Sequence, residues 1–482
     1  MYTTNSLYKH ANYDINQTIY SQMLSDSQCE EIYVTALDLL ERSGTKVTNK
    51  KAREILSKNG CIVEDDIVYL STAKVQDALQ KAPFRVTLND RLGNKRVLME
   101  TCNSQIGPGV GAEKVLDKDK IRAATMDDLK DTAIVAEALK QMDFIAPAVA
   151  PKDGGKAAAL CAFKTLTENS TKPIVMPAQN AAEAEALYQM AAVAVGGEAR
   201  LCRMPYLALC TGTNQSMQHD DDALDVVIAA AEKNLPVIYT GDFVSGLTAP
   251  YTQAGTLVVA LAADLFALVL SQSVRSGAPF VFGGKFSIND EVNKATPVAS
   301  PENGLANFGF ANIARYLDMP CACQSGSSDS FISDTQLGMD STYGIVSASL
   351  AGANVVFGCG AMGSGKVFSL SSLALCDEIG ALIRRIMKSG SVDEDRIGRG
   401  VIGEISPAGN YLGTEHTNVF FKSEQYWPNL QTRKRIDDWL EDGGKTMGQR
   451  AEIYVTQLLT GDNANPLTAE QTDKLAAIVA SF

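Results

Sequence analysis

Beyond residue 100, apolar and polar positions repeat one pattern: a short apolar run, a loop rich in glycine or polar residues, and an amphipathic helical stretch. The apolar runs do not alternate with polar residues, as is typical of parallel strands buried on both faces. These runs lie at residues 104–107, 144–149, 173–176, 206–210, 236–240, 279–283, 320–323 and 354–358. The spacing predicts helices at residues 127–140, 155–169, 181–195, 221–233, 254–276, 302–317, 334–351 and 369–389.

Eight strand–helix units in succession predict an α/β fold, a TIM (β/α)8 barrel over residues 101–390. The main alternative, an open doubly wound sheet, usually carries a glycine-rich phosphate fingerprint at its first turn. The run Gly107-x-Gly109-x-Gly111 lacks the spacing of that fingerprint, and no acidic residue about 20 positions on completes a ribose site. The barrel is therefore the favoured interpretation.

Two flanking regions differ from the repeat. Residues 1–100 mix helical and strand-like stretches and predict an N-terminal α+β cap, whose first 20 residues are expected to form a polar arm. Residues 391–482 predict a C-terminal helical extension that packs on the barrel, and they carry both tryptophans. The division expected is 1–100, 101–390 and 391–482.

Composition narrows the class of protein. A net charge of −13 argues against a nucleic-acid surface and against binding to anionic membranes. The N-terminus has no apolar core for a signal peptide, and the longest apolar stretch, 255–270, contains Asp264 and falls short of a membrane span. Ten cysteines predict reduced thiols and a cytoplasmic protein, and three histidines argue against a His/Cys zinc site.

The active site of a TIM barrel lies at the carboxyl ends of its strands. Those ends offer no histidine, no paired carboxylates at glycosidase spacing and no serine-hydrolase motif. They do offer Phe243, Phe286, Phe331 and Phe357, whose ring faces are suited to hold a quaternary ammonium group. Local packing is the alternative role for each ring. Asp242 or Asp329 is expected to supplement such a cage, and a turn or a helix cap is the alternative role for each.

An ordered series of motifs resembles the trimethylamine methyltransferase-like superfamily. Its central part is Ser328-Asp329-Ser330, followed by Asp334-x-Gln336-x-Gly338-x-Asp340 and, after a helix, Ala351-Gly352-Ala353-Asn354. Its C-terminal part comprises Gly413-x-x-His416-Thr417, Trp427-Pro428-x-Leu430, Arg433, Trp439 and Arg450-Ala451. The likeness covers most of the chain, from about Ala36 to Ala451.

The resemblance implies a barrel enzyme that moves a methyl group from an amine to the Co(I) of a separate corrinoid protein. The founding branch uses pyrrolysine and acts on trimethylamine, whereas this chain has only standard residues. It therefore looks like the branch that demethylates glycine betaine, proline betaine, carnitine and related quaternary amines. No cofactor is then bound by this chain itself, no metal site is expected, and a homo-oligomer is expected.

Candidate roles follow from this reading. Asp329 and His416 are the candidate catalytic groups, with His416 reaching over the barrel mouth or, alternatively, fixing the tail. Gln324, the 325–328 loop or a cationic His416 is expected to bind the substrate carboxylate. The alternatives are a trimethylamine-type tertiary amine methyltransferase, a Schiff-base lyase or aldolase using Lys285, and a betaine-binding protein without enzymatic activity.

Overall fold

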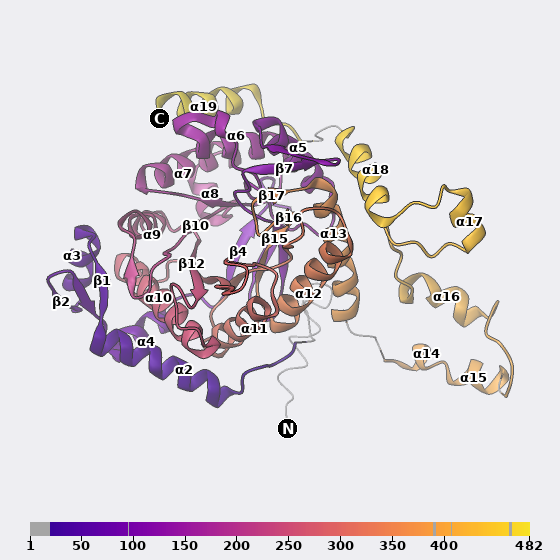
Figure 1. The fold of residues 1–482 in the computed structure, drawn as a ribbon, viewed down its shortest axis with the longest axis horizontal. Coiled ribbons are helices and arrows are strands. Elements are labelled where there is room, and N and C mark those ends of the chain that lie inside the picture. Colours follow the sequence, from indigo (N-terminus) through magenta and orange to yellow (C-terminus); the bar gives the residue numbers. More distant parts are fainter. Residues whose placement is uncertain (1–19, 95, 389–391, 406, 462–464) are drawn as a thin grey trace.

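A parallel sheet closed into a barrel forms the centre of the computed structural model, which describes residues 20–94, 96–388, 392–405, 407–461 and 465–482 (Figure 1). Within these residues seven parallel strands pair in the order β6–β15–β14–β13–β12–β10–β9. Their bounds are β6 Gln105–Pro108, β9 Ile174–Pro177, β10 Leu207–Thr211, β12 Val237–Ser245, β13 Phe280–Ile288, β14 Cys321–Gln324 and β15 Val355–Cys359. The predicted TIM barrel is confirmed.

The eighth position of the barrel is filled by an irregular segment. Met142 forms a parallel bridge with Ile106 of β6, and Ile145 forms one with Ile174 of β9. The Ile145 N–H donates to the Pro173 carbonyl over 2.9 Å, so the ring closes. The prediction of a regular strand at 144–149 was wrong in detail, because Pro147 has no N–H to donate to a ladder.

The predicted barrel helices are all present. Their bounds are α5 Met126–Ala138, α6 Ala158–Asn169, α7 Ala181–Val195, α9 Asp221–Lys233, α10 Gln253–Val274, α11 Pro301–Tyr316, α12 Thr335–Ala351 and α13 Leu370–Met387, with a 3-10 turn at Lys152–Ala157 and a short α8 at Glu198–Arg203. Among described residues α10 alone has the length and apolarity of a membrane span, and 89% of its apolar window is buried inside the molecule.

Strands β12 and β13 run about five residues beyond their predicted ends. Side chains of a strand alternate between its faces. Thr240 and Asp242 of β12 therefore point into the barrel, whereas Phe243 points to the helical layer, where it is fully buried. Because of this extension, residues that were expected in loops lie on strands, where their side chains point in a fixed direction.

The N-terminal region contributes to the barrel in two ways. Its first part forms a layer in which the helices α2, α3 and α4 pack against α10. The elements of this layer are α2 (Asp26–Asp38), a π-helical turn (Leu39–Ser43), β1 (Thr45–Val47), α3 (Lys50–Lys58), β2 (Ile62–Glu64), β3 (Ile67–Tyr69) and α4 (Thr72–Lys81). The hairpin β4 (Val86–Asn89) and β5 (Arg96–Met99) closes the amino-terminal end of the barrel, since Leu88 and Met99 pack with Ile238 and Val355 inside it. The predicted polar arm lies largely at residues 1–19, outside the described residues.

Short elements and the C-terminal region complete the fold. A small sheet contains β7 (Lys114–Asp117), β8 (Lys120–Ala123), β16 (Ala361–Met362) and β17 (Val367–Phe368), and β11 (Gln218–His219) pairs with β1. Helices α14 (Glu394–Ile397), α15 (Arg399–Ile405), α16 (Glu415–Glu424) and α17 (Ile436–Glu441) project away from the barrel in Figure 1. The chain then returns, with α18 (Met447–Leu459) against α13 and α5, and α19 (Ala469–Ser481) against α7 and α6.

Candidate active site

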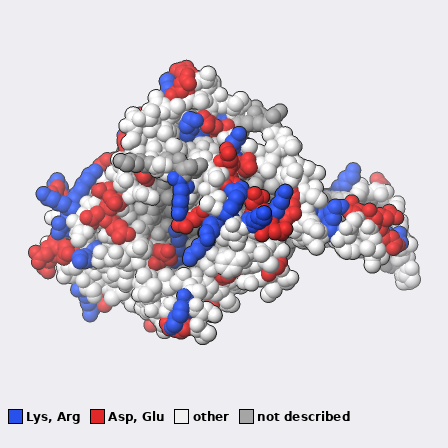
Figure 2. Space-filling model, turned by 45° about the horizontal axis from the view of Figure 1, so that its top comes forward, with Lys and Arg blue, Asp and Glu red and all other residues white. Residues whose placement is uncertain are grey.

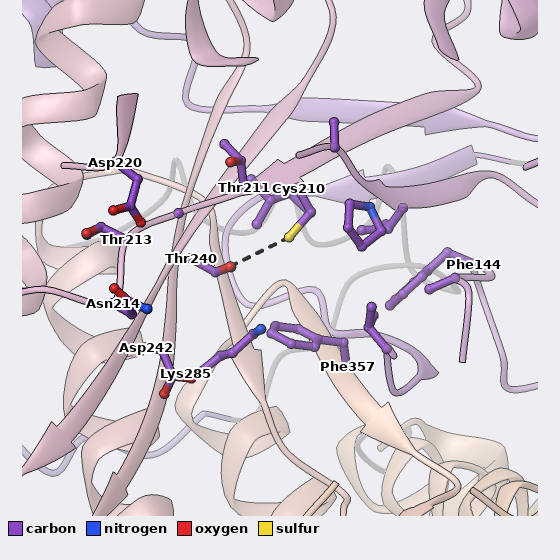
Figure 3. Close-up of a pocket in the computed structure, with 17 residues that line it drawn as sticks. Phe144, Cys210, Thr211, Thr213, Asn214, Asp220, Thr240, Asp242, Lys285 and Phe357 are labelled. Carbon is purple, nitrogen blue, oxygen red and sulfur yellow. Dashed lines mark hydrogen bonds between the residues drawn. The ribbon is translucent and has the colours of Figure 1, made fainter. Parts of the chain in front are cut away.

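A cavity of about 270 Å³ opens at the carboxyl ends of the barrel strands (Figure 3). Its apolar lining includes Phe144 and Phe357, which are both buried and belong to the core inside the barrel. Its polar lining includes Asp242 and Asn214, which are both exposed to solvent. The cavity therefore has a closed aromatic end and an open polar end.

A second cavity of about 250 Å³ adjoins the first. Val110, Asp242 and Lys285 line both cavities, so these residues form the boundary between them. The second cavity is also lined by Gln324, Phe286 and the loops 296–298 and 364–365. The barrel mouth is thus one depression with two compartments.

Opposite charges meet at that boundary. Asp242 and Lys285 are register partners on the adjacent strands β12 and β13. Neither the Asp242 carboxylate nor Lys285 Nζ has an ion pair or hydrogen bond with another described residue. Figure 3 shows Lys285 reaching from the side of Asp242 towards the ring of Phe357. Both charges are consequently available to a ligand.

A second carboxylate, Asp220, lines the first cavity from the N-cap of α9. Its side chain accepts no hydrogen bond from the helix. Partial burial, together with the nearby carboxylates of Asp221 and Asp222, raises its pKa above the ordinary aspartate value. Asp220 and Asp242 therefore concentrate negative charge at the open end, a potential that attracts cations.

Cys210 marks the middle of the cavity. Its Sγ lies 3.6 Å from the hydroxyl of Thr240 on the next strand. Burial raises the pKa of the Cys210 thiol, and the positive charge of Lys285 acts in the opposite direction. Since raising the pKa keeps the thiol protonated, Cys210 is a neutral neighbour of the Lys285 ammonium group.

The predicted site residues separate into two groups. Phe357 lines the first cavity, and Phe286 and Gln324 line the second. Phe243 does not line either cavity, and its ring stacks on Phe286 with centroids 6.1 Å apart. The aromatic cage stays a prediction, with Phe357 joined in the first cavity by Phe144.

The remaining three predicted residues lie outside the lining of both cavities. The Asp329 carboxylate accepts hydrogen bonds from the backbone N–H groups of Val298 and Ala299, both 3.0 Å away, and from the Ser364 hydroxyl at 2.7 Å. Asp329 thus ties two mouth loops together. Phe331 is 58% exposed and lies beside Gly363 at the rim.

His416 lies on α16, away from the barrel. Its Nε2 is 3.0 Å from the Asp395 carbonyl, and its ring packs against Phe420 of the same helix. Within one chain His416 therefore contacts its own helical projection and does not line the mouth cavities. Its proposed catalytic role stays a prediction.

Two lining residues had been singled out from the sequence, Asp242 as a possible supplement to the cage and Lys285 as the Schiff-base alternative. Sequence reasoning missed Phe144 and Asp220 as lining residues. Phe144 is the first residue of the second apolar run, and Asp220 directly precedes the predicted helix 221–233. The local sequence around each residue does not indicate that the side chains of Phe144 and Asp220 line the same cavity.

Neither histidine chemistry nor a metal cluster is evident in the described part of the barrel. No group of three or more His, Cys, Asp and Glu residues is placed there to hold a metal ion. His219 is buried, stacks on Phe266, and lies with Nδ1 2.6 Å from the Tyr239 hydroxyl. Burial lowers the pKa of His219 to about 3, so the ring is neutral and structural.

Comparisons with known proteins cover nearly the whole chain. A family model described as trimethylamine methyltransferase (MTTB) matches residues 3–481. A trimethylamine methyltransferase of Desulfitobacterium hafniense strain DCB-2 is 30% identical over 465 residues, 94% of this chain and 92% of that protein. A glycine betaine methyltransferase of strain Y51 is 28% identical over 463 residues, 95% of this chain and 96% of that protein.

The same type of fold occurs in a solved structure. The crystal structure of the Methanosarcina barkeri monomethylamine methyltransferase matches with a TM-score of 0.52 at 11% identity. The match covers 95% of this chain and 92% of the other. At that identity the likeness establishes the barrel fold alone.

Proposed function

The chain belongs to the trimethylamine methyltransferase (MTTB) family, and we propose that it transfers a methyl group from a quaternary amine of the betaine class to the Co(I) of a separate corrinoid protein. The observation that carries the proposal is an unpaired Lys285 ammonium group that lines one cavity with two carboxylates, Asp242 on the adjacent strand and Asp220 at the N-cap of α9. A betaine carries a carboxylate and a quaternary ammonium group a few bonds apart. The cavity offers a charge of the opposite sign to each.

The charges also favour one orientation of the substrate. Asp242 is exposed at the open end, whereas Lys285 extends inward towards Phe357. A substrate entering carboxylate first places its carboxylate at Lys285 and its ammonium group near Asp220 and Asp242. The N-methyl groups then face the opening, where a corrinoid bound to another protein has access to them.

The reaction needs little from the protein beyond binding and orientation. The Co(I) electron pair forms the new cobalt–carbon bond, and the electron pair of the broken carbon–nitrogen bond stays on the amine. Because a quaternary nitrogen already carries a full positive charge, the amine leaves neutral and no general acid is required. A cavity lined by carboxylates, a lysine and neutral side chains is sufficient for that chemistry.

The corrinoid is proposed to belong to the partner. The first cavity, of about 270 Å³, is of a size that suits a small amine, and the corrinoid is proposed to approach the open mouth from the partner protein. The ten cysteines, which all lie in described segments, are free thiols. Free thiols support the proposal of a cytoplasmic enzyme that meets its corrinoid partner there.

The test mixes the protein with reduced corrinoid protein and a panel of N-methylated amines, and follows the methyl-cobalt absorbance. We expect rapid methylation with glycine betaine, proline betaine or carnitine, and none with trimethylamine. Trimethylamine turnover comparable to that of the best betaine would overturn the proposal. The purified chain is expected to be colourless, and stoichiometric bound corrinoid would contradict the division between the two proteins.

A second function is favoured by the position of Lys285 itself. A lysine amine inside a barrel cavity is the arrangement that Schiff-base lyases and aldolases require. Borohydride reduction in the presence of a carbonyl substrate would trap a covalent adduct at Lys285 in that case. The methyl transfer proposed here predicts no such adduct.

A further inference from the structure

The second cavity of the barrel mouth has no role in the function proposed above. Its volume of about 250 Å³ is close to the 270 Å³ of the first cavity. Ser287, Thr296 and Gln324 line the second cavity and not the first. None of these three side chains has a hydrogen bond with another described residue. The second cavity therefore offers unpaired hydrogen-bonding groups to a ligand.

Ser287 is the most enclosed of these groups. It lies on β13 two residues beyond Lys285, and side chains two positions apart on a strand point to the same face. Ser287 is only 8% exposed, yet it lines the cavity. Because a buried hydroxyl without a partner is unfavourable, Ser287 gains from any group in the cavity that completes its hydrogen bond.

The walls of the second cavity are fixed by hydrogen bonds between loops. The Asp329 carboxylate joins the loop at 298–299 to Ser364, and Val298 and Ser364 both line the cavity. The Asp329 loop is itself held by the Asp340 carboxylate of α12. That carboxylate accepts hydrogen bonds from the Ser328 hydroxyl at 2.8 Å and from the Asp329 N–H at 3.1 Å. A cavity with fixed walls is preorganised for a ligand of one shape.

Charge in the second cavity is confined to its boundary with the first. Among the described residues that line it, Asp242 and Lys285 alone are charged, and both also line the first cavity. In the proposed orientation they face the ammonium and carboxylate groups of the betaine. The carbon chain that joins those two groups then passes along the boundary, and a substituent on that chain extends into the second cavity.

The lining restricts the chemistry of such a substituent. A further charge in the second cavity would have no counter-charge, and burial of an unpaired charge is costly. An apolar substituent would leave Ser287 and Gln324 without partners. A neutral group that both donates and accepts hydrogen bonds, such as a hydroxyl, meets neither penalty.

Selection among betaines depends on contacts of this kind inside the mouth. A betaine has no net charge, and Figure 2 shows acidic and basic side chains close together on the visible face of the molecule. Long-range attraction therefore does not distinguish one betaine from another. A site built to hydrogen-bond a substrate hydroxyl, by contrast, discriminates against an analogue that lacks it.

We infer, on the basis of the betaine chemistry proposed above, that the second cavity binds a hydroxyl group carried on the chain between the ammonium and carboxylate groups of the substrate. Ser287 and Gln324 are the specificity-determining residues. Gln324 then binds the hydroxyl and not the carboxylate, because Lys285 reaches into the first cavity whereas Gln324 lines only the second. The enzyme is consequently selective for hydroxylated betaines over betaines with an unsubstituted chain.

The test is calorimetric titration of the full chain, without corrinoid protein, with γ-butyrobetaine and with carnitine. These two probes differ by one hydroxyl on the chain that joins the charged groups. The wild type is expected to bind carnitine about five- to tenfold more tightly. Ser287→Ala and Gln324→Met should each reduce this preference to about threefold or less, and the double variant should bind the two probes about equally.

Two controls accompany these variants. Affinity for γ-butyrobetaine should stay within about twofold in every variant, which also shows that the variants are folded. Ser57→Ala and Gln457→Met make the same substitutions at exposed positions of α3 and α18, and both should keep the full preference for carnitine.

The outcomes separate this inference from the proposed function. Equal affinity of the wild type for both probes overturns the hydroxyl subsite and leaves betaine binding intact, and so does a preference that the double variant retains. Equal losses for both probes in the variants also overturn it, because Ser287 and Gln324 would then support the mouth in general. If neither probe nor glycine betaine binds, the proposed function fails and the subsite fails with it.

Discussion

Asp242 and Lys285 occupy the same register position on the neighbouring parallel strands β12 and β13, and both side chains line the barrel mouth. Side chains at one register position of a parallel pair point to the same face of the sheet. The pair thus sets a positive and a negative charge side by side without joining them in an ion pair. A zwitterionic substrate is a ligand that satisfies both.

The first prediction concerns Lys285. Lys285→Met keeps most of the side-chain volume and removes the charge. Since hydrogen bonds to charged groups contribute roughly 1.5–3 kcal/mol, glycine betaine should lose about 10- to 100-fold in affinity. Binding of tetramethylammonium, which has no carboxylate, should stay within about twofold. Calorimetric titration of both ligands is the measurement.

Lys294→Met serves as the matched control, because Lys294 is exposed on a loop after β13 and pairs with Glu291. It should leave both affinities unchanged. Equal losses for the betaine and for tetramethylammonium in Lys285→Met would show that Lys285 supports the cavity in general and does not bind the carboxylate.

The second prediction is a pH dependence of binding that originates at Asp220. Its pKa is raised by burial and by its acidic neighbours, so it loses its charge at a higher pH than an ordinary aspartate. Affinity for a quaternary ammonium group should therefore fall as the pH decreases through that raised pKa. Asp220→Asn should abolish this part of the profile and lower the affinity at neutral pH by about three- to tenfold.

Asp222→Asn gives an internal comparison. It removes a like charge that raises the pKa of Asp220, so the profile should keep its form and its midpoint should move to lower pH. A midpoint that does not move, or an Asp220→Asn profile identical to the wild type, would contradict the assignment.

The third prediction separates two roles of Phe357. As an apolar wall, its ring keeps water from the closed end of the cavity, where Lys285 meets the carboxylate. Phe357→Ala should then reduce kcat/KM by about tenfold, and Phe357→Leu, which stays apolar, by no more than about twofold. If the ring face binds the ammonium group as in a cage, the leucine variant loses as much as the alanine variant. Phe84→Ala, at an exposed position, is the control.

The fourth prediction concerns stability. Asp264 of α10 is fully buried, and its carboxyl accepts a hydrogen bond from the Gly283 N–H of β13 at 2.8 Å. Burial raises its pKa well above the usual value. Stability from this group is therefore complete below the unfolded-state pKa, about 3.9, and declines as the pH rises through the folded-state pKa.

Asp264→Asn keeps the shape and the acceptor but cannot ionise. The difference in free energy of unfolding between this variant and the wild type should shift in favour of the variant as the pH rises from 4 to 8. The shift is about 1.4 kcal/mol for each pH unit below the folded-state pKa. Denaturant unfolding at several pH values measures it, and a difference independent of pH would refute the proposed ionisation.

The sequence by itself determined the barrel. Helices α7 and α9 begin and end where the apolar spacing placed them, and seven of the eight apolar runs became strands of the closed sheet. The ordered motifs from Ser328 to Ala451 indicated the family that the whole-chain match confirms. These features succeed because periodicity, caps and motif order are local properties of the chain.

Only the tertiary structure decided which side chains share the mouth. The extension of β12 beyond residue 240 turned Phe243 outward and Asp242 inward, because successive strand residues face opposite sides. The Asp329 side chain joins the loops at residues 298–299 and 364 by hydrogen bonds. His416 lies on α16 of the C-terminal projection and does not line the mouth cavities. Register between strands far apart in sequence and the path of the C-terminal region depend on long-range packing, which no local pattern of residues contains.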